Sequence, residues 1–525
     1  MTRQSHSSNF VKYIDEFSPF IAAISTSSAT GNFLMRKHVI VILLLFLSNA
    51  SLFADWPQFR GPNSNGIYQG KPIPTEFGPD TNELWSTSIP PGHSSPCVVG
   101  DSIFLTSVLI AEKKLEVICI DRKTGEIRWR NPIVVDRFEK GHPSFNPASS
   151  SPASDGKRVV AYFGSYGLIC FDMAGKKLWD VKMPLTKSYA GNATSPAIFG
   201  NKVILYRGNQ VDHFVLAVDK QSGKEIWKVD QEEPFHLELA CTSCPILSGD
   251  KLILHTARSV QALDIESGKS IWVAKCATTA TSTPVISDDS VIVAAWNKMG
   301  EPALRPTFPS FEKLISKNDK DGDKLISRDE FPIMMIFHRP DGAEAPENGA
   351  SLRFEYSDKD KNGKITEGEW KVQLQNMADF RARYQTHGML AIPLASQGLV
   401  DQEKVRTLED QAIPEVPSPL FHNGLIYFVK NGGVLTCYDL KKNKRVYRMR
   451  TQGSGTHYAS PIIANNKLYT IAGDGKVSVL SLGPNPKIVA VNQFNERIYA
   501  SPAVSKGVLY IRTHAKIYAF GTKSF

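Results

Sequence analysis

Two acid-rich stretches of twelve residues have the spacing of a cation-binding loop. Residues 319–330 read DKDGDKLISRDE, and residues 358–369 read DKDKNGKITEGE. A hard cation such as Ca²⁺ needs roughly six to eight oxygens, and such a loop supplies them from alternate side chains, one carbonyl and a final bidentate Glu. The expected ligands are Asp319, Asp321, Asp323, Leu325, Ser327 and Glu330 in loop one and Asp358, Asp360, Asn362, Lys364, Thr366 and Glu369 in loop two, with Leu325 and Lys364 giving carbonyl oxygens.

Apolar residues at helical spacing flank the two loops. Phe311, Leu314 and Ile315 precede loop one, and Trp370, Leu374 and Met377 follow loop two. This arrangement is typical of an EF-hand pair. The alternative is an acidic segment that binds nothing, but it would account for one degenerate loop better than for two loops that both end in Glu.

The two loops differ at their sixth position. Loop two has Gly363 there, whereas loop one has Lys324. The sharp turn favours a left-handed backbone, in which a side chain costs about 1 kcal/mol. We therefore expect loop two to bind calcium more tightly, with stable occupancy and a structural role.

A repeated layout surrounds the loops. Eight segments begin with a Ser-Pro-like dipeptide and continue as a short apolar run, a turn and a second apolar run, mostly at intervals of some forty residues. They cover residues 94–106, 150–164, 194–206, 242–255, 281–295, 417–429, 459–471 and 500–512. The period and the alternating strands predict an all-β fold, an eight-bladed β-propeller.

Four repeats end in a glycine turn followed by a tryptophan. The tryptophans are Trp129, Trp179, Trp227 and Trp272, and we expect them to pack between neighbouring blades. The segment ELWSTSI at 83–89 resembles an outer strand that lacks its inner strands, while the last repeat ends before any such strand. The N-terminal strand is therefore predicted to complete the eighth blade.

The fifth repeat contains an insertion. The gap between Pro284 and Pro419 is much longer than the others and holds both loops. We place the small α-helical EF-hand insertion at 301–385 in blade five, with propeller segments at 55–300 and 386–525.

The N-terminus has the pattern of a secretory signal. Basic residues after Met35 precede the apolar run VIVILLLFL, which is short for a bilayer span, and small residues follow. We assign a signal peptide to 35–54, cleaved after Ala54 or alternatively Ala50, and residues 1–34 to a mis-called extension. An uncleaved anchor is the competing interpretation. A signal peptide predicts a periplasmic or secreted protein.

Seven cysteines remain in the mature chain, an odd number. Cys119, Cys170 and Cys437 occupy matching strand contexts and are expected to be buried as small apolar residues. Cys241 and Cys244 form a CTSC motif that fits a disulfide or an inert pair better than a redox or zinc site. Cys276 is a further pairing candidate.

The Ser-Pro starts and the glycine-tryptophan ends resemble the pyrroloquinoline-quinone-type (PQQ-like) β-propeller repeat family, over nearly all of 55–525 outside the insertion. The resemblance implies the fold and two functions. One is a non-catalytic scaffold for a protein or polysaccharide partner. The other is a PQQ-dependent dehydrogenase with the cofactor in the funnel, although the chain lacks a Cys-Cys dipeptide and leaves Trp296 as its stacking candidate.

A polar set before the Ser-Pro starts is expected to line one mouth of the central channel or to cap strand ends. It comprises His93, His142, Asn146, Asn192, Glu238, His457, Tyr458, Arg497 and Tyr499. We identify no nucleophile-base set, so no catalytic residue is assigned. The net charge of +9 comes from scattered residues without a basic stripe, which argues against nucleic acid. We expect a monomer.

Overall fold

The computed structural model describes residues 55–236, 239–339, 349–382 and 384–522. The predicted signal peptide, the 1–34 extension and Glu238 lie outside the described residues. Within the described ranges, no helix combines the length and the apolar character needed to cross a membrane.

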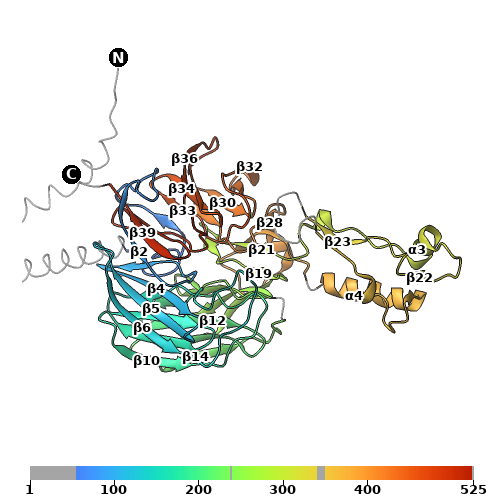
Figure 1. The fold of residues 1–525 in the computed structure, drawn as a ribbon, viewed down its shortest axis with the longest axis horizontal. Coiled ribbons are helices and arrows are strands. Elements are labelled where there is room, and N and C mark those ends of the chain that lie inside the picture. Colours follow the sequence, from blue (N-terminus) through green and yellow to red (C-terminus); the bar gives the residue numbers. More distant parts are fainter. Residues whose placement is uncertain (1–54, 237–238, 340–348, 383, 523–525) are drawn as a thin grey trace, which may run out of the picture. The chain divides into compact units, whose positions relative to one another are not determined.

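Eight mainly antiparallel sheets form an eight-bladed β-propeller, which confirms the predicted fold class (Figure 1). Blade one contains β3 (Cys97–Val99), β4 (Ser102–Leu109), β5 (Lys114–Asp121) and β6 (Ile127–Val134), and blade two contains β7 (Ala153–Ser154), β8 (Arg158–Phe163), β9 (Gly167–Asp172) and β10 (Lys177–Lys182). Blade three contains β11 (Ala197–Phe199), β12 (Lys202–Gly208), β13 (His213–Asp219) and β14 (Glu225–Asp230). Blade four contains β15 (Ile246–Ser248), β16 (Lys251–His255), β17 (Ser259–Asp264), β18 (Ser270–Lys275) and β27 (Gly398–Leu399).

The other four blades follow the same plan. Blade five contains β19 (Ala280–Thr281), β20 (Val285–Ile286), β21 (Ser290–Trp296), β26 (Gly388–Pro393) and β28 (Arg406–Glu409), and blade six contains β29 (Leu420–His422), β30 (Leu425–Lys430), β31 (Val434–Asp439) and β32 (Lys444–Arg450). Blade seven contains β33 (Ile462–Ala464), β34 (Lys467–Ile471), β35 (Lys476–Ser481), β36 (Ile488–Gln493) and β1 (Ile67–Tyr68). Blade eight contains β37 (Ala503–Ser505), β38 (Val508–Arg512), β39 (Lys516–Phe520) and β2 (Glu83–Ser88).

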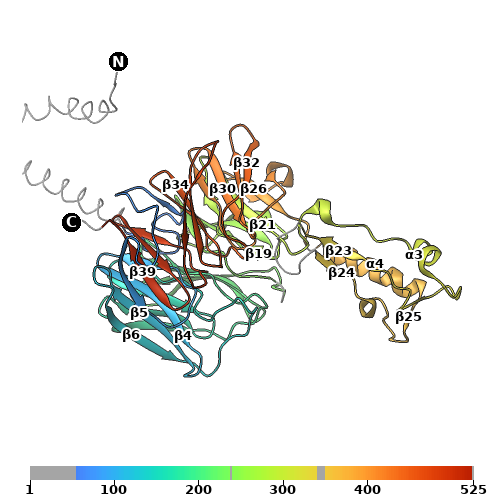
Figure 2. The ribbon, with the colours of Figure 1, turned by 45° about the horizontal axis from the view of Figure 1, so that its top comes forward.

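The eighth blade joins the two ends of the described chain. Strand β2 pairs antiparallel with β39, and Trp85 lies opposite Ala519. Figures 1 and 2 show β39 within this blade. The prediction that 83–89 completes the last blade is therefore confirmed. Closure removes the unpaired strand edge that an open sheet would present.

Hydrophobic clusters fill the spaces between neighbouring blades. One cluster joins Val117 of blade one to Ala161 of blade two, and the next joins Val160 of blade two to Leu205 of blade three. The middle strands are consequently buried on both faces and read as continuous apolar runs. The outer strand β2 instead alternates between half-buried and exposed residues, because one of its faces meets solvent.

The insertion lies between β21 and β26 of blade five and has a small core of its own. It contains the helices α3 (Phe311–Asn318) and α4 (Glu367–Ala382), the strand pairs β22 (Ile326–Ser327) with β25 (Lys364–Ile365) and β23 (Met335–His338) with β24 (Gly349–Ser351), and short 3₁₀ turns (Figure 2). Leu314, Ile326, Ile365 and Trp370 are buried together. A strand, β23, follows loop one where a complete EF-hand would have a helix.

Candidate metal loops and central cavity

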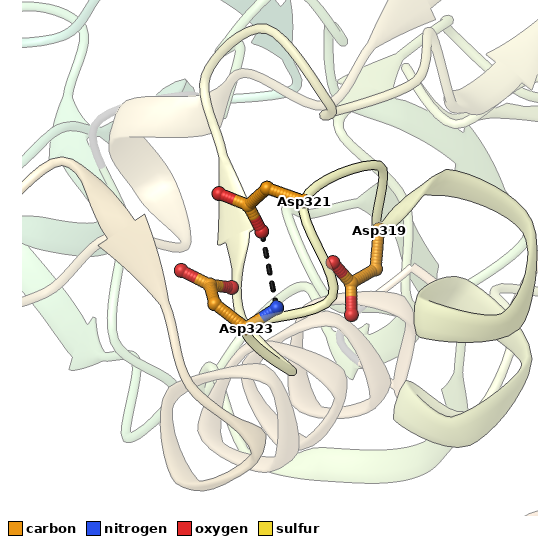
Figure 3. Close-up of side chains that lie close together, drawn as sticks. All are labelled: Asp319, Asp321 and Asp323. Atoms are coloured by element: carbon orange, nitrogen blue, oxygen red, sulfur yellow. Dashed lines mark hydrogen bonds between the residues drawn. The ribbon is translucent and has the colours of Figure 1, made fainter.

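The two acidic loops each bring three carboxylates together. The side-chain oxygens of Asp319, Asp321 and Asp323 lie within 4.8 Å of one another. Figure 3 shows this trio, in which the backbone N–H of Asp323 donates to Asp321 Oδ1 at 3.1 Å. In loop two the same limit holds for Asp358, Asp360 and Glu369.

The terminal glutamates are held in the same way in both loops. Glu330 accepts the backbone N–H of Lys320 at 2.8 Å and that of Ser327 at 2.9 Å. Glu369 accepts the N–H groups at the equivalent positions of loop two, also at 2.8 and 2.9 Å. The hydrogen bond from the Ser327 hydroxyl is the largest cause that lowers the pKa of Glu330 to about 2. The terminal carboxylate of loop one therefore stays ionised to a lower pH than an ordinary glutamate does.

Strands β22 and β25 couple the loops. Ile326 lies opposite Ile365 in this pair, so the apolar eighth residues of the two loops meet in the insertion's core. Lys324 and Gly363, the sixth residues, adopt φ values of 62° and 85°. At this sixth position only loop one makes the left-handed turn with a side chain. At the fourth position the roles are exchanged, with Gly322 in loop one and Lys361 at φ 63° in loop two.

A lysine from loop two contacts an acid of loop one. Lys364 Nζ forms an ion pair with Asp323 Oδ2, and the hydrogen bond from Lys364 is the largest cause that lowers the pKa of Asp323. A cation entering loop one must displace this ammonium group. This contact is the reason to propose tighter binding in loop two, because the left-handed Lys324 of loop one is matched by the left-handed Lys361 of loop two.

The Ser-Pro starts form a closed ring of hydrogen bonds around the propeller axis. In each blade, the backbone N–H of the residue before Pro donates to the side chain at the same position of the next blade, at 2.8–3.3 Å. The eight residues are Ser95, Ser151, Ser195, Cys244, Thr283, Ser418, Ser460 and Ser501. The ring explains why the repeat needs a small side chain with an acceptor there, a role that the sequence pattern did not show.

Cys244 is the thiol member of this ring. Its Sγ accepts the N–H of Ser195 at 3.3 Å, and Cys241 Sγ accepts the N–H of Gly208 at 3.2 Å. All seven cysteines lie in the described part of the chain and are buried and free. The disulfide interpretation of the CTSC motif is therefore wrong, because both sulfurs are free and accept hydrogen bonds from separate backbone partners. Cys119, Cys170 and Cys437 are buried in strands as predicted.

Substitution of Cys244 tests the ring. Cys244→Ser keeps an acceptor, so we expect the free energy of unfolding to change by less than about 1 kcal/mol. Cys244→Ala leaves the buried N–H of Ser195 without its partner and is expected to cost about 1–3 kcal/mol. Urea unfolding of both variants measures the difference, and equal midpoints would contradict the role of the ring.

The outer-strand tryptophans pack on the glycine turns of the next blade. Trp129 Nε1 donates to the carbonyl of Met173 at 3.1 Å, and the indole covers Gly175, where a Cβ would lie 2.8 Å from the ring. Trp85, Trp179 and Trp227 repeat this contact. Trp272 is fully buried but pairs with Gly398 of β27 instead. The core assignment of these tryptophans is confirmed.

The segment at 55–67 crosses the inner strands of several blades. Trp56 bridges Val98 of blade one, the Pro57 carbonyl accepts the N–H of Ser154 of blade two, and Gln58 Oε1 accepts the N–H of Ile198 of blade three. On the opposite side of the ring, Arg60 Nη2 donates to the Pro419 carbonyl at 2.5 Å, and β1 pairs with β33. The segment therefore spans the axis, and Phe59 lines the cavity there.

The central cavity measures about 140 Å³ and is bounded by the serine ring and by aromatic side chains. Of the predicted polar set, His93, Tyr458 and Tyr499 line it. Asn146 and Arg497 line a neighbouring cavity of about 170 Å³. The ring hydroxyls that line the cavity each accept one N–H, and a hydroxyl group can in addition donate one hydrogen bond.

Other members of the polar set hold the backbone. His142 contacts Ser144, Asn192 donates to the Gly208 carbonyl, and His457 contacts the Gly455 carbonyl. These three residues therefore agree with the prediction that members of the polar set cap strand ends. Trp296 is 5% exposed within the core of blades five and six, with the Arg339 guanidinium 5.6 Å from its ring, and does not line the central cavity.

Comparison with known proteins supports the fold. A family model described as outer membrane protein assembly factor BamB matches residues 113–305. None of the curated proteins compared with the chain matches it. A europium-containing methanol dehydrogenase is 12% identical, with a TM-score of 0.52 over 90% of this chain and 99% of that one.

Two further solved structures are similar. A quinohemoprotein alcohol dehydrogenase from Comamonas testosteroni is 13% identical, with a TM-score of 0.51 over 92% of this chain and 83% of that one. BamB from Moraxella catarrhalis is 12% identical, with a TM-score of 0.47 over 84% of this chain and 99% of that one. The chain is thus a β-propeller with the fold of the PQQ-type repeat proteins, and residues 113–305 carry the sequence match.

Proposed function

We propose that the chain is a periplasmic or secreted calcium-binding β-propeller that acts as a non-catalytic scaffold for a protein or polysaccharide partner. The observation that carries the calcium proposal is the pair of matched loops. Each loop brings three carboxylates together, with Glu369 among those of loop two, and each holds its terminal Glu on the same two N–H groups. Calcium is expected to bind the twelve ligands predicted from the sequence and to brace the insertion. Loop two is expected to fill first.

The scaffold proposal rests on the central cavity and on the matched family. Among the described residues that line the cavity, none is acidic. The hydroxyl of Ser144 lies 2.7 Å from His142 Nδ1, but this ring nitrogen also faces the backbone N–H of Ser144 at 3.3 Å, as in a local turn contact. The family that matches residues 113–305 is described as an assembly factor. A propeller can present the loops of eight blades to a partner without any reaction in its channel.

The alternative function is that of a PQQ-dependent dehydrogenase, because two dehydrogenase structures have the same fold as this chain. The residues fit the cofactor poorly. Trp296, the stacking candidate, lies in the core of blades five and six, and the described cavity lining offers no carboxylate as a catalytic base. We therefore rank this function second.

Calorimetric titration with Ca²⁺ tests the proposal. We expect binding in the range of about 10⁻⁴–10⁻³ M that secreted calcium modules commonly show. Glu369→Gln is expected to weaken the tighter site roughly tenfold or more, because the bidentate ligand loses its charge, and Glu330→Gln to weaken the other. Glu367→Gln changes an exposed acid of the same helix outside both clusters and is the matched control.

The outcomes separate the two functions. If the heat of calcium binding is lost in the Glu330→Gln/Glu369→Gln variant, the result supports calcium binding by the two loops. If the unsubstituted protein gives no heat, or if the double variant gives the same heat, the result contradicts it. A titration of the calcium-loaded protein with PQQ follows. Heat from PQQ that survives in the double variant would place a cofactor site in the propeller and would overturn the scaffold proposal.

A further inference from the structure

Two arginines, Arg497 and Arg512, line the cavity beside the central one. Its lining includes His93, Phe145, Arg497, Tyr499, Arg512 and His514. Among these described residues, none is acidic, and the two arginines supply the positive charge, since the low pKa of His93 leaves its ring neutral at pH 7. The acid nearest in sequence, Glu496, accepts hydrogen bonds from the Thr513 hydroxyl and the Ala515 N–H instead.

Arg512 is a buried cation held only by neutral groups. It is 1% exposed, and its Nη1 donates to Ser94 Oγ at 2.5 Å and to the Thr106 carbonyl at 2.7 Å. Its Nη2 donates to the Pro90 carbonyl at a longer 3.3 Å, and its Nε has no partner among the described residues. A Cβ at Gly92 would lie 2.3 Å from Nη2, so glycine makes room for the guanidinium.

The cavity is electrostatically positive. Burial lowers the pKa of His93 to about 3, and the charges of Arg512 and His514 add to this effect. Burial also lowers the pKa of Arg512 to about 9, which still leaves the guanidinium charged at pH 7. Arg497 and His514 are exposed at the rim. A buried charge without an acid favours an anionic ligand that would compensate it.

An aromatic wall connects this cavity to the central one. His93, Phe145 and Tyr499 line both cavities. The rings of His93 and Tyr499 are 5.0 Å apart, and those of Tyr499 and Tyr458 are 5.1 Å apart, both edge to face. Phe59 and Val416 add apolar surface on the central side. A ligand that spans both cavities would meet cations at one end and rings at the other.

We propose that the two cavities form one binding site for a carboxylate carried on a compact apolar body. The carboxylate lies beside Arg497 and Arg512, and the body packs against Phe145 and Tyr499. Arginine donates paired N–H groups that match a carboxylate, and Arg512 retains unused donors. A free organic acid and the C-terminus of a polypeptide both offer this chemistry. The inference goes beyond the scaffold proposal and does not depend on calcium.

Calorimetry with paired probes tests the site in the presence of EDTA, so that failure of the calcium proposal does not affect the result. The probes are 3-phenylpropanoate with its amide, and glycyl-glycyl-phenylalanine with its C-terminal amide. We expect each acid to bind at least about tenfold more tightly than its amide, because the amide lacks the charge. A tighter peptide indicates a polypeptide C-terminus as the source, and a tighter small acid indicates a free metabolite.

The variant Arg497→Gln removes an exposed charge from the rim without touching the buried Arg512, whose loss would disturb the fold. We expect it to weaken both acids about tenfold. Arg353→Gln, an exposed arginine in the insertion, is the control and is expected to change nothing. The site is refuted if neither acid binds, if the amides bind equally well, or if Arg497→Gln binds like Arg353→Gln.

Discussion

Replacing Trp227 with alanine is expected to lower the free energy of unfolding by about 3–5 kcal/mol. Trp227 is 8% exposed and packs between blades three and four. Its Nε1 donates to the Ile265 carbonyl at 3.2 Å, and its ring covers Gly268. Alanine removes this contact, and the left-handed glycine turn beneath has no side chain to fill the space.

Urea unfolding measures the effect. The matched control is Ile226→Ala, which changes the neighbouring residue on β14, a side chain that is 40% exposed. We expect this control to shift the free energy of unfolding by less than about 1 kcal/mol. Equal unfolding midpoints for the two variants would show that the tryptophan does not hold the blades together.

Replacing Glu139 with glutamine is expected to stabilise the protein at pH 8 by about 2–3 kcal/mol. Glu139 is 6% exposed, and neither carboxylate oxygen has a hydrogen-bond partner among the described residues. Burial is the largest cause that raises its pKa from 4.5 to about 7, although Arg207 acts in the opposite direction. An ionised carboxylate in this position is unfavourable, and glutamine carries no charge.

The sign of the pH dependence follows from the raised pKa. Between pH 4.5 and 7 the folded chain keeps a proton that the unfolded chain releases, so stability falls as the pH rises through this window. The advantage of Glu139→Gln is therefore expected to be small at pH 4.5 and full above pH 7. Chemical unfolding at pH 4.5, 6 and 8 checks this dependence. The exposed Glu126→Gln is the control, and a pH-independent difference would contradict the assignment.

Local patterns predicted much of the fold. The Ser-Pro starts, the glycine turns and the tryptophan ends repeat because each blade meets the same neighbour in the same way, so eight copies predicted eight blades. The closing role of 83–89 followed from one missing strand. The acidic loops were recognisable because their carboxylates lie within twelve consecutive residues.

Sites that combine distant segments were only partly predictable. His93, Tyr458 and Tyr499 precede Ser-Pro starts and were expected at the channel, which is where they lie. Arg512 was missed because it ends a strand and has no repeated counterpart to mark it. Its partners at Pro90, Ser94 and Thr106 are some four hundred residues away in sequence, and only ring closure brings them together.

The sequence by itself determined the repeat, the number of blades, the closing strand and the spacing of the loop acids, since these depend on contacts that recur or that lie close along the chain. The tertiary structure decided the serine ring, the path of 55–67 across the axis, the contact of Lys364 with Asp323 and the cationic cavity. The serine ring uses a position that recurs in every repeat, but its hydrogen bonds form only when neighbouring blades meet around the axis. The other three features arise once, where non-equivalent segments meet, so no pattern in the sequence repeats them.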